Sequence, residues 1–220
     1  PGSRGPVHLA RLHAEQGLGD TLQFCRFAQA LAARGARVLL EVQAPLLVLL
    51  AQLPGVHGLI ARGQSLPAFD LHCPLLSVPL ALGLTLENMP PAQTYLQAEA
   101  ALARTWAEKI DDGSILRVGL VWSGRPEHKN DHNRSIPLAE FQQILRPDQR
   151  YHCLQKEFRS ADLQTLTTRS DIAVWDTQLN SFSDTAALIA SMDLVVSVDT
   201  SVAHLAAAMG KPVWLLLPFS

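Results

Sequence analysis

The stretch Leu194–Pro218 reads LVVSVDTSVAHLAAAMGKPVWLLLP and carries the clearest structural signal in the chain. Its first five residues are rich in valine, as in a strand that is buried on both faces of a parallel sheet. The corner Asp199-Thr200-Ser201 follows, and its residue types favour the N-terminus of a helix. A glycine and a proline then end a short apolar helix before a second apolar run, VWLLL. The stretch therefore predicts a strand–corner–helix–strand unit of an α/β fold.

The corner at residues 199–201 is expected at the carboxyl end of its strand, where open α/β sheets bind their ligands. The first N–H groups of a helix have no partner within the helix, so this position favours an anion such as a phosphate. The alternative is that Asp199 and Thr200 only cap the helix. The sequence of the corner leaves both interpretations open.

Composition limits the class of protein. The 220 residues are 48% hydrophobic with a net charge of −2, which fits one large or two small domains and favours no nucleic-acid partner. No apolar run approaches the length of about 20 residues that a transmembrane helix needs. Cys25, Cys73 and Cys153 lie far apart, a pattern typical of the cytoplasm rather than of a disulfide framework or a zinc site. Residues 1–5, PGSRG, resemble a linker, so the chain is expected to be part of something longer.

Strand and helix patterns alternate along the chain, and this alternation predicts doubly wound parallel sheets of the Rossmann-like kind. Strands are expected at residues 7–14, 37–42, 57–61, 69–72, 116–122, 151–155, 172–175, 194–198 and 213–217. Helices are expected at residues 22–34, 46–53, 75–82 in part, 98–110, 138–145, 161–167, from 183 or 184 to 191, and from 202. Breaks near residues 88–91 and 111–114 predict two domains, 1–100 and 101–220.

The loop before the first helix contains Gly17 and Gly19, which let a ligand approach the backbone closely. Asp20 follows, and a carboxylate at this position can accept a proton from a substrate hydroxyl. Its alternative role is to cap the helix. A dinucleotide-binding fingerprint needs a third glycine where Leu22 stands, although Glu41 lies where a ribose-binding acid would be. A nicotinamide-dependent dehydrogenase is therefore a weaker alternative.

A long polar loop, residues 123–135, reads SGRPEHKNDHNRS and follows an expected strand. Its basic side chains suit a phosphate, and loops of this length are often functional, although a solvated connection is the plain alternative. His128 and His132 are four residues apart, but the residues between them are poor helix formers, so no metal site is expected.

Three segments taken in order resemble glycosyltransferase family 9, the heptosyltransferase-like enzymes. They are EQGLGDTLQFCRF at 15–27, GLVWSGRPEHKNDHNRSIPL at 119–138 and DLVVSVDTSVAHLAAAMGKPVWLLLPF at 193–219. More closely, the chain resembles the region at the carboxyl end of many bacterial tetratricopeptide-repeat proteins. The resemblance implies a GT-B-like fold, in which two Rossmann-like domains face a cleft. It also implies an N-terminal acceptor-side domain at 1–100 and a C-terminal domain at 101–220 that binds a nucleotide sugar and is cut short at its end.

The resemblance further implies an inverting, metal-independent transfer of a sugar from a nucleotide-diphosphate donor, without another cofactor, to a glycan or other hydroxyl acceptor. In that case Asp20 is the general base, Arg134 supplies the cation for the donor phosphate, and Asp199 lies near the sugar. The residues implied to bind the donor are Gly17, Gly19, Ser123, Gly124, Lys129, Gln155, Lys156, Thr200, Ser201 and His204. A lone histidine on an alanine-rich helix, such as His204, is also typical of a packed structural residue.

Two classes of function therefore follow from the sequence. The first is a cytoplasmic glycosyltransferase. The second is a non-catalytic glycosyltransferase-like module that binds a ligand or partner beside tetratricopeptide repeats in a parent protein.

Overall fold

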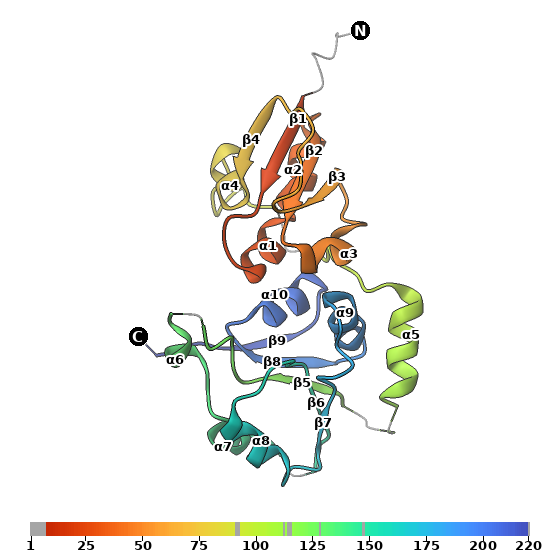
Figure 1. Ribbon diagram of the computed structural model, residues 1–220, viewed down its shortest axis with the longest axis vertical. Coiled ribbons are helices and arrows are strands. Elements are labelled where there is room, and N and C mark those ends of the chain that lie inside the picture. The colour runs from red at the N-terminus through yellow and green to blue at the C-terminus, as the bar shows by residue number, and fades with distance from the viewer. Residues whose placement is uncertain are drawn as a thin grey trace. The chain divides into compact units, whose positions relative to one another are not determined.

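The computed structural model describes residues 8–90, 93–111, 113, 116–127, 129–146 and 148–219. The chain divides into two compact units, Pro1–Leu96 and Gln97–Ser220, and each unit contains one parallel sheet (Figure 1). The expected linker at residues 1–5, part of the break at 111–114 and His128 lie outside the described residues.

The sheet of unit 1 has the strand order β3-β2-β1-β4, and all pairs are parallel. Its strands are β1 (Leu9–His13), β2 (Arg37–Val42), β3 (Val56–Ala61) and β4 (Leu71–Pro74). Its helices are α1 (Leu18–Phe24), α2 (Phe27–Ala33), α3 (Leu47–Leu50) and α4 (Val78–Ala81), with short 3₁₀ turns η1 (Ala44–Leu46) and η2 (Leu75–Ser77). From β1 the chain adds β2 and β3 on one side of the sheet and then returns to add β4 on the other side of β1. The direction of winding therefore switches between β1 and β4.

The helices of unit 1 differ from expectation in their boundaries. The single helix expected at 22–34 is two helices, because the Ala28 N–H bonds to the Cys25 carbonyl three residues back and tightens the turn between them. Pro79 does not interrupt its helix but lies in the first turn of α4, where a missing N–H leaves no bond unmade. After α4, Tyr95 closes the unit by donating its hydroxyl to the Leu22 carbonyl at 2.8 Å, and burial raises the pKa of this phenol.

The sheet of unit 2 has the strand order β7-β6-β5-β8-β9 and is also parallel throughout. Its strands are β5 (Val118–Val121), β6 (Tyr151–Cys153), β7 (Ile172–Val174), β8 (Leu194–Val198) and β9 (Val213–Leu216). Its helices are α5 (Ala100–Lys109), α6 (Asp131–Arg134), α7 (Leu138–Phe141), α8 (Ser160–Leu166), α9 (Phe182–Ala190) and α10 (Ser201–Ala208), with a 3₁₀ turn η3 (Gln142–Ile144). The switch in winding lies between β5 and β8.

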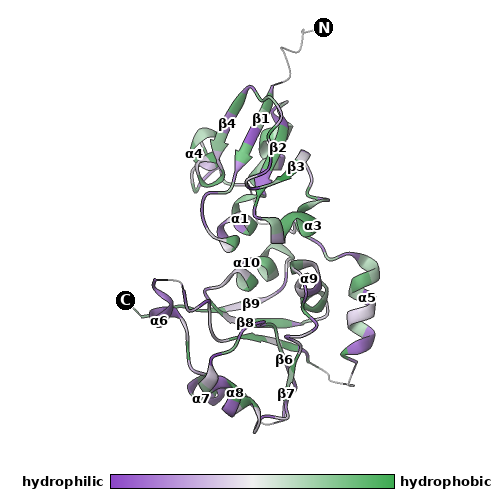
Figure 2. Ribbon diagram, viewed as in Figure 1, coloured by the Kyte–Doolittle hydropathy of each residue, from purple (hydrophilic) through white to green (hydrophobic). Residues whose placement is uncertain are grey.

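Helices cover both faces of this second sheet, with α9 and α10 on one face and α7 and α8 on the other (Figure 1). Figure 2 shows hydrophobic residues concentrated in the strands of both units, whereas α6 is hydrophilic. Strand β5 is buried along its whole length, which explains its unbroken apolar sequence. The prediction of two doubly wound parallel sheets is therefore confirmed, and all nine expected strands are present.

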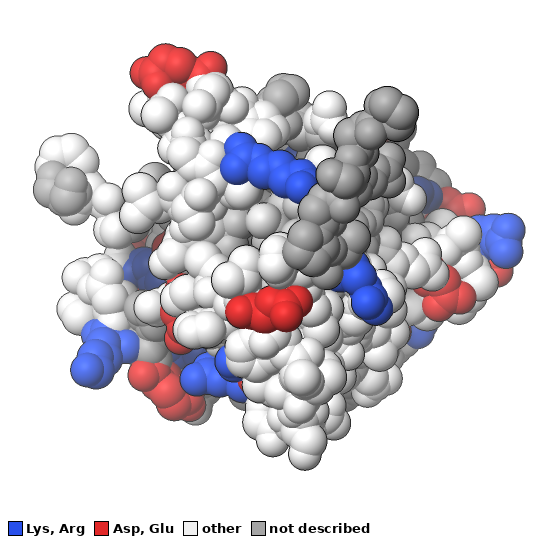
Figure 3. All heavy atoms as spheres, turned by 90° about the horizontal axis from the view of Figure 1, so that it is seen from above, with Lys and Arg blue, Asp and Glu red and all other residues white. Residues whose placement is uncertain are grey.

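The three cysteines are free. Among the described residues, no helix has both the length and the apolar character to cross a membrane. On the face shown in Figure 3, basic and acidic side chains are interspersed among uncharged atoms.

The indole of Trp122 lies in the core of unit 2, fully buried and stacked on Phe158 with ring centroids 5.9 Å apart. Its Nε1–H donates to Asp162 Oδ2 at 3.1 Å, and the N–H of Leu138 donates to Oδ1 of the same carboxylate at 2.9 Å. Asp162 is only 2% exposed. One buried carboxylate thus satisfies two donors and ties α8 to the end of β5 and the start of α7.

We expect Asp162→Asn to lower the free energy of unfolding by about 1–3 kcal/mol, because one of the two donors then faces an amide NH₂. Chemical denaturation of the full chain measures this difference. The control is Asp148→Asn, whose side chain is 64% exposed and pairs with the exposed Arg146, and which should change stability by about 0.5 kcal/mol or less. Equal stability of the two variants would contradict the role of Asp162.

Candidate functional site

The loops after β5 and β8 diverge at the carboxyl edge of the second sheet, where the winding switches direction. Ser123 and Gly124 follow β5, and the corner at residues 199–201 follows β8. This is the position at which open α/β sheets hold ligands, so these loops form the candidate site.

Thr200 is the N-cap residue of α10, but its side chain makes no capping hydrogen bond. Its hydroxyl lies 3.1 Å from that of Ser197, which is fully buried. The alternative that this threonine serves as a side-chain cap is therefore wrong. By contrast, Ser181 caps α9, because its hydroxyl accepts the Asp184 N–H and the Asp184 carboxylate accepts the Ser181 N–H. The first turn of α10 thus starts without the side-chain cap that α9 has.

The carboxylate of Asp199 turns toward His204 on the first turns of α10. Asp199 Oδ1 and His204 Nε2 are 3.7 Å apart, a separation that forms an ion pair when the imidazole is protonated. The two side chains are 52% and 29% exposed, so both are open to a ligand. His204 is thus a partly exposed residue beside the corner and not a packed core histidine.

Arg134 bridges the two loops of the site. Its Nη1 donates to the carbonyl of Asp199 at 2.8 Å, and its guanidinium lies against the backbone of Gly124. A Cβ atom at position 124 would lie 2.7 Å from Cζ of Arg134, so only glycine leaves room for the arginine. The structure thus brings together three predicted residues, Gly124, Arg134 and Asp199.

Arg134 ends α6, a one-turn helix that the sequence did not predict. The residues of this turn are poor helix formers, and the expectation of an irregular loop rested on that propensity. The turn forms because Asp131, 4% exposed, accepts a hydrogen bond from Ser135 Oγ at 2.8 Å and contacts two arginines. Tertiary contacts outweigh the weak local preference.

Ser123 and Gln155 are buried, and the glutamine supports the loop after β5. Its Oε1 accepts the N–H groups of Trp122 and Ser123 at 2.6 and 2.9 Å, and its Nε2 donates to Ser123 Oγ at 3.1 Å. Gln155 is 5% exposed. The structure therefore places Gln155 beneath the loop, whereas Lys156, next in sequence, is exposed.

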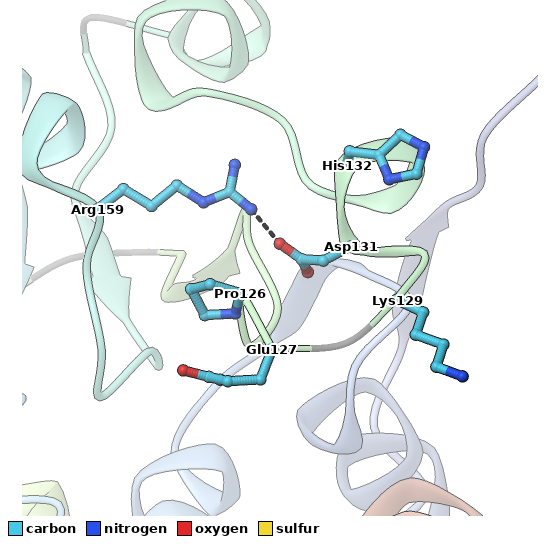
Figure 4. A pocket seen from close by; sticks show the side chains of 6 residues that line it. All are labelled: Pro126, Glu127, Lys129, Asp131, His132 and Arg159. Atoms are coloured by element: carbon cyan, nitrogen blue, oxygen red, sulfur yellow. Dashed lines mark hydrogen bonds and ion pairs between the residues drawn. The ribbon is translucent and has the colours of Figure 1, made fainter.

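A pocket of about 430 Å³ opens beside α6. It is lined by Pro126, Glu127, Lys129, Asp131, His132 and Arg159 (Figure 4). Arg159 and Asp131 point toward each other from different elements and form an ion pair. Of these residues only Lys129 was predicted as a site residue. The sequence signal that could have identified Asp131 is an acidic residue inside a basic loop. No group of metal-binding side chains is present among the residues that the structure describes.

In unit 1 the glycine loop is arranged around a helix cap. Gly17 is the N-cap residue of α1, and its N–H donates to Asp20 Oδ2 at 2.9 Å. Gly19 lies inside the first turn of α1. Oδ2 of Asp20 therefore caps the helix, as the alternative role predicts. Its Oδ1 has no hydrogen-bond partner among the described residues.

Glu41 is not placed to bind a ribose. It is 7% exposed and forms a buried ion pair with Arg11, with Arg11 Nε 2.7 Å from Oε2. A ribose could bind Glu41 only if this pair were broken. The alternative of a nicotinamide cofactor therefore lacks the acidic residue that would bind its ribose.

The stretch that contains the corner also has a family match. Glycosyltransferase family 9 (heptosyltransferase) matches residues 176–216. This family 9 segment spans α9, β8, α10 and β9 and includes the corner with His204. No curated protein matches the chain.

Several solved structures have the same fold at low sequence identity. ADP-heptose LPS heptosyltransferase II of E. coli is 14% identical with a TM-score of 0.66, over 94% of this chain and 84% of its own. A family 9 glycosyl transferase from Veillonella parvula is 13% identical with a TM-score of 0.65, over 100% and 84%. E. coli heptosyltransferase WaaC with ADP-2-deoxy-2-fluoro heptose is 12% identical with a TM-score of 0.60, over 96% and 90%. The chain therefore has a GT-B-like, two-sheet α/β fold.

The two helix starts within the family 9 segment should respond differently to loss of their hydroxyls. We expect Ser181→Ala to lower the free energy of unfolding by about 1 kcal/mol, because α9 loses its cap. Thr200→Val removes no cap bond and loses only the contact of its hydroxyl with Ser197, so it should lower the free energy of unfolding by less, about 0.5 kcal/mol. Thermal and chemical denaturation compare the two variants. An equal loss in both would contradict this difference between the two helix starts.

Proposed function

We propose that the chain is a glycosyltransferase of the family 9 type, which moves a sugar from a nucleotide-diphosphate donor to an acceptor hydroxyl. The single observation that supports this most is the corner after β8. There a helix begins without a side-chain cap, and Arg134 is hydrogen-bonded to the corner's own backbone. Both features favour a bound phosphate.

The donor diphosphate is proposed to bind to the N–H groups of Thr200 and Ser201 and to the guanidinium of Arg134. Charge that develops on the departing diphosphate is then met by fixed dipoles and a fixed cation, without reorganisation at the moment of reaction. This is the basis on which we propose a transfer that needs no metal ion. Ser123 and Gly124 are proposed to present their loop to the phosphates.

The remaining predicted residues of unit 2 have secondary roles in this proposal. Lys129 and Lys156 are exposed cations that add to the attraction for an anionic donor. His204 Nε2 and Asp199 Oδ1, 3.7 Å apart, are proposed to contact the sugar or ribose hydroxyls. Gln155 acts through the loop that it supports.

Asp20 is the proposed general base in unit 1. Inverting transfer needs a carboxylate that takes the proton of the attacking hydroxyl. One oxygen of Asp20 holds the Gly17 N–H and fixes the side chain, which leaves the other oxygen for the acceptor. Gly17 keeps a side chain away from this carboxylate, since a Cβ atom at position 17 would lie 3.3 Å from Asp20 Oδ2.

The capping bond of Asp20 also favours a second candidate, a non-catalytic module that binds the nucleotide without transferring the sugar. In either form we propose a place beside tetratricopeptide repeats in a cytoplasmic bacterial protein. That part of the proposal is supported by the resemblance of the three sequence segments.

We expect a nucleoside diphosphate to bind and stabilise the unaltered protein, and Arg134→Gln to weaken this binding about tenfold or more. The reason is that a charged hydrogen bond contributes about 1.5–3 kcal/mol, and 1.4 kcal/mol is tenfold. Calorimetric titration with ADP, UDP and GDP measures the affinity. Arg146→Gln is the control, since that side chain is 73% exposed and pairs only with Asp148 among the described residues. A lack of binding to all three nucleotides would contradict the proposal.

Asp20→Asn should lower the rate of sugar transfer by about 10²-fold or more, while the donor affinity stays unchanged. Asparagine can still accept the Gly17 N–H and keep the cap, but it cannot take a proton. Release of nucleoside diphosphate from candidate donors, with and without glycan acceptors, reports the transfer. Full activity of this variant would remove Asp20 as the base. Donor binding without turnover in the unaltered protein would favour the non-catalytic module.

A further inference from the structure

Asp131 lies buried under the loop that follows β5, with its side chain only 6% exposed. Its Oδ1 accepts hydrogen bonds from Ser135 Oγ at 2.8 Å and from Arg134 Nε at 3.3 Å. Its Oδ2 accepts a hydrogen bond from Arg159 Nη2. One buried carboxylate thus contacts two guanidinium groups and a hydroxyl.

These bonds join three loops at the carboxyl edge of the sheet. The Ser135 hydroxyl, which donates to Asp131, accepts the N–H of Gly124 in the loop after β5 at 2.9 Å. Arg159 belongs to the loop after β6 and points toward Asp131 (Figure 4). Arg134 continues to the corner after β8 through its bond to the Asp199 carbonyl. The carboxylate is therefore the common partner of the loops that form the candidate site.

The charges favour a role in orienting Arg134 rather than in neutralising it. One carboxylate faces the two arginines Arg134 and Arg159, so a net positive charge remains. Arg134 is held by Asp131 at Nε, by the Asp199 carbonyl at Nη1 and by the backbone of Gly124, which lies against the guanidinium. A cation held in this way pays little conformational entropy when an anion binds.

We propose that Asp131 is a positioning residue of the donor site, which holds the guanidinium of Arg134 in the orientation that meets the donor diphosphate. Both oxygens of Asp131 are already bonded to Ser135 and to the two arginines, so it acts through Arg134. The inference rests on the proposed function, because it assigns the anion that Arg134 meets.

Asp162 is the matched control for a purely structural carboxylate. It is buried to a similar degree in the same unit and also accepts hydrogen bonds at both oxygens. Its donors are the indole of Trp122 and the backbone of Leu138, and no arginine is bonded to it among the described residues. Loss of Asp162 should weaken the fold without affecting Arg134.

The test is a double-mutant cycle on the affinity for ADP, UDP and inorganic pyrophosphate, measured by calorimetric titration of the full chain. We expect Asp131→Asn to weaken binding about tenfold, since it removes the charge that orients Arg134. Arg134→Gln should weaken binding at least as much, and the double variant should bind no more weakly than Arg134→Gln alone. Asp162→Asn should lower the melting temperature and leave the affinity within about twofold.

Additive effects of Asp131→Asn and Arg134→Gln would overturn the inference, as would an equal loss of affinity in Asp162→Asn. If Asp131→Asn does not fold, Gly124→Ala replaces it, because the added methyl group displaces the guanidinium from its bond to Asp131 while the Asp131 side chain itself is kept. Binding by Gly124→Ala as tight as in the unaltered protein would also overturn the inference. If the unaltered protein binds none of the three probes, the proposed function fails first and this inference fails with it.

Discussion

The hydrogen bond from Arg134 to the Asp199 carbonyl is the interaction on which the candidate site depends. It joins two loops that follow different strands and are 65 residues apart in sequence. Because Gly124 lacks a side chain, the guanidinium can lie against the backbone of the first loop. The same guanidinium is held at a second nitrogen, Nε, which donates to the buried carboxylate of Asp131. The position of one cation is thus over-determined by three partners.

The two units share the same topology, but side chains of opposite charge join the two loops at the switch in winding. In unit 1 the carboxylate of Glu15, after β1, accepts the N–H of Leu75, after β4, and Asp20 caps α1. In unit 2 a cation joins the two loops, and the helix after β8 starts without a side-chain cap. A carboxylate thus joins the two loops in unit 1 and a guanidinium joins them in unit 2. The fixed cation in unit 2 supports the proposed binding of an anionic donor there.

The central strands β5 and β8 were predictable because strands buried on both faces need continuous apolar runs, whereas β3, β4 and β9 are only partly buried. Helix ends were less predictable, as the break after Cys25 shows, because local hydrogen bonds compete there with similar energies. The turn at α6 was missed since its stability comes from Arg159, 28 residues away. Gln155 was placed at the correct loop, but its burial beneath that loop depends on packing that sequence patterns do not show.

The sequence by itself determined the order of strands and helices along the chain, the position of the polar corner after β8 and the presence of a polar, basic loop after β5. These follow from residue type and spacing, which act locally. Only the tertiary structure decided that Thr200 does not cap its helix, that Arg134 is bonded to that corner, and that Glu41 forms an ion pair with Arg11. The physical reason is that a polar side chain finds its partner among groups brought together by folding, and several partners compete for each one.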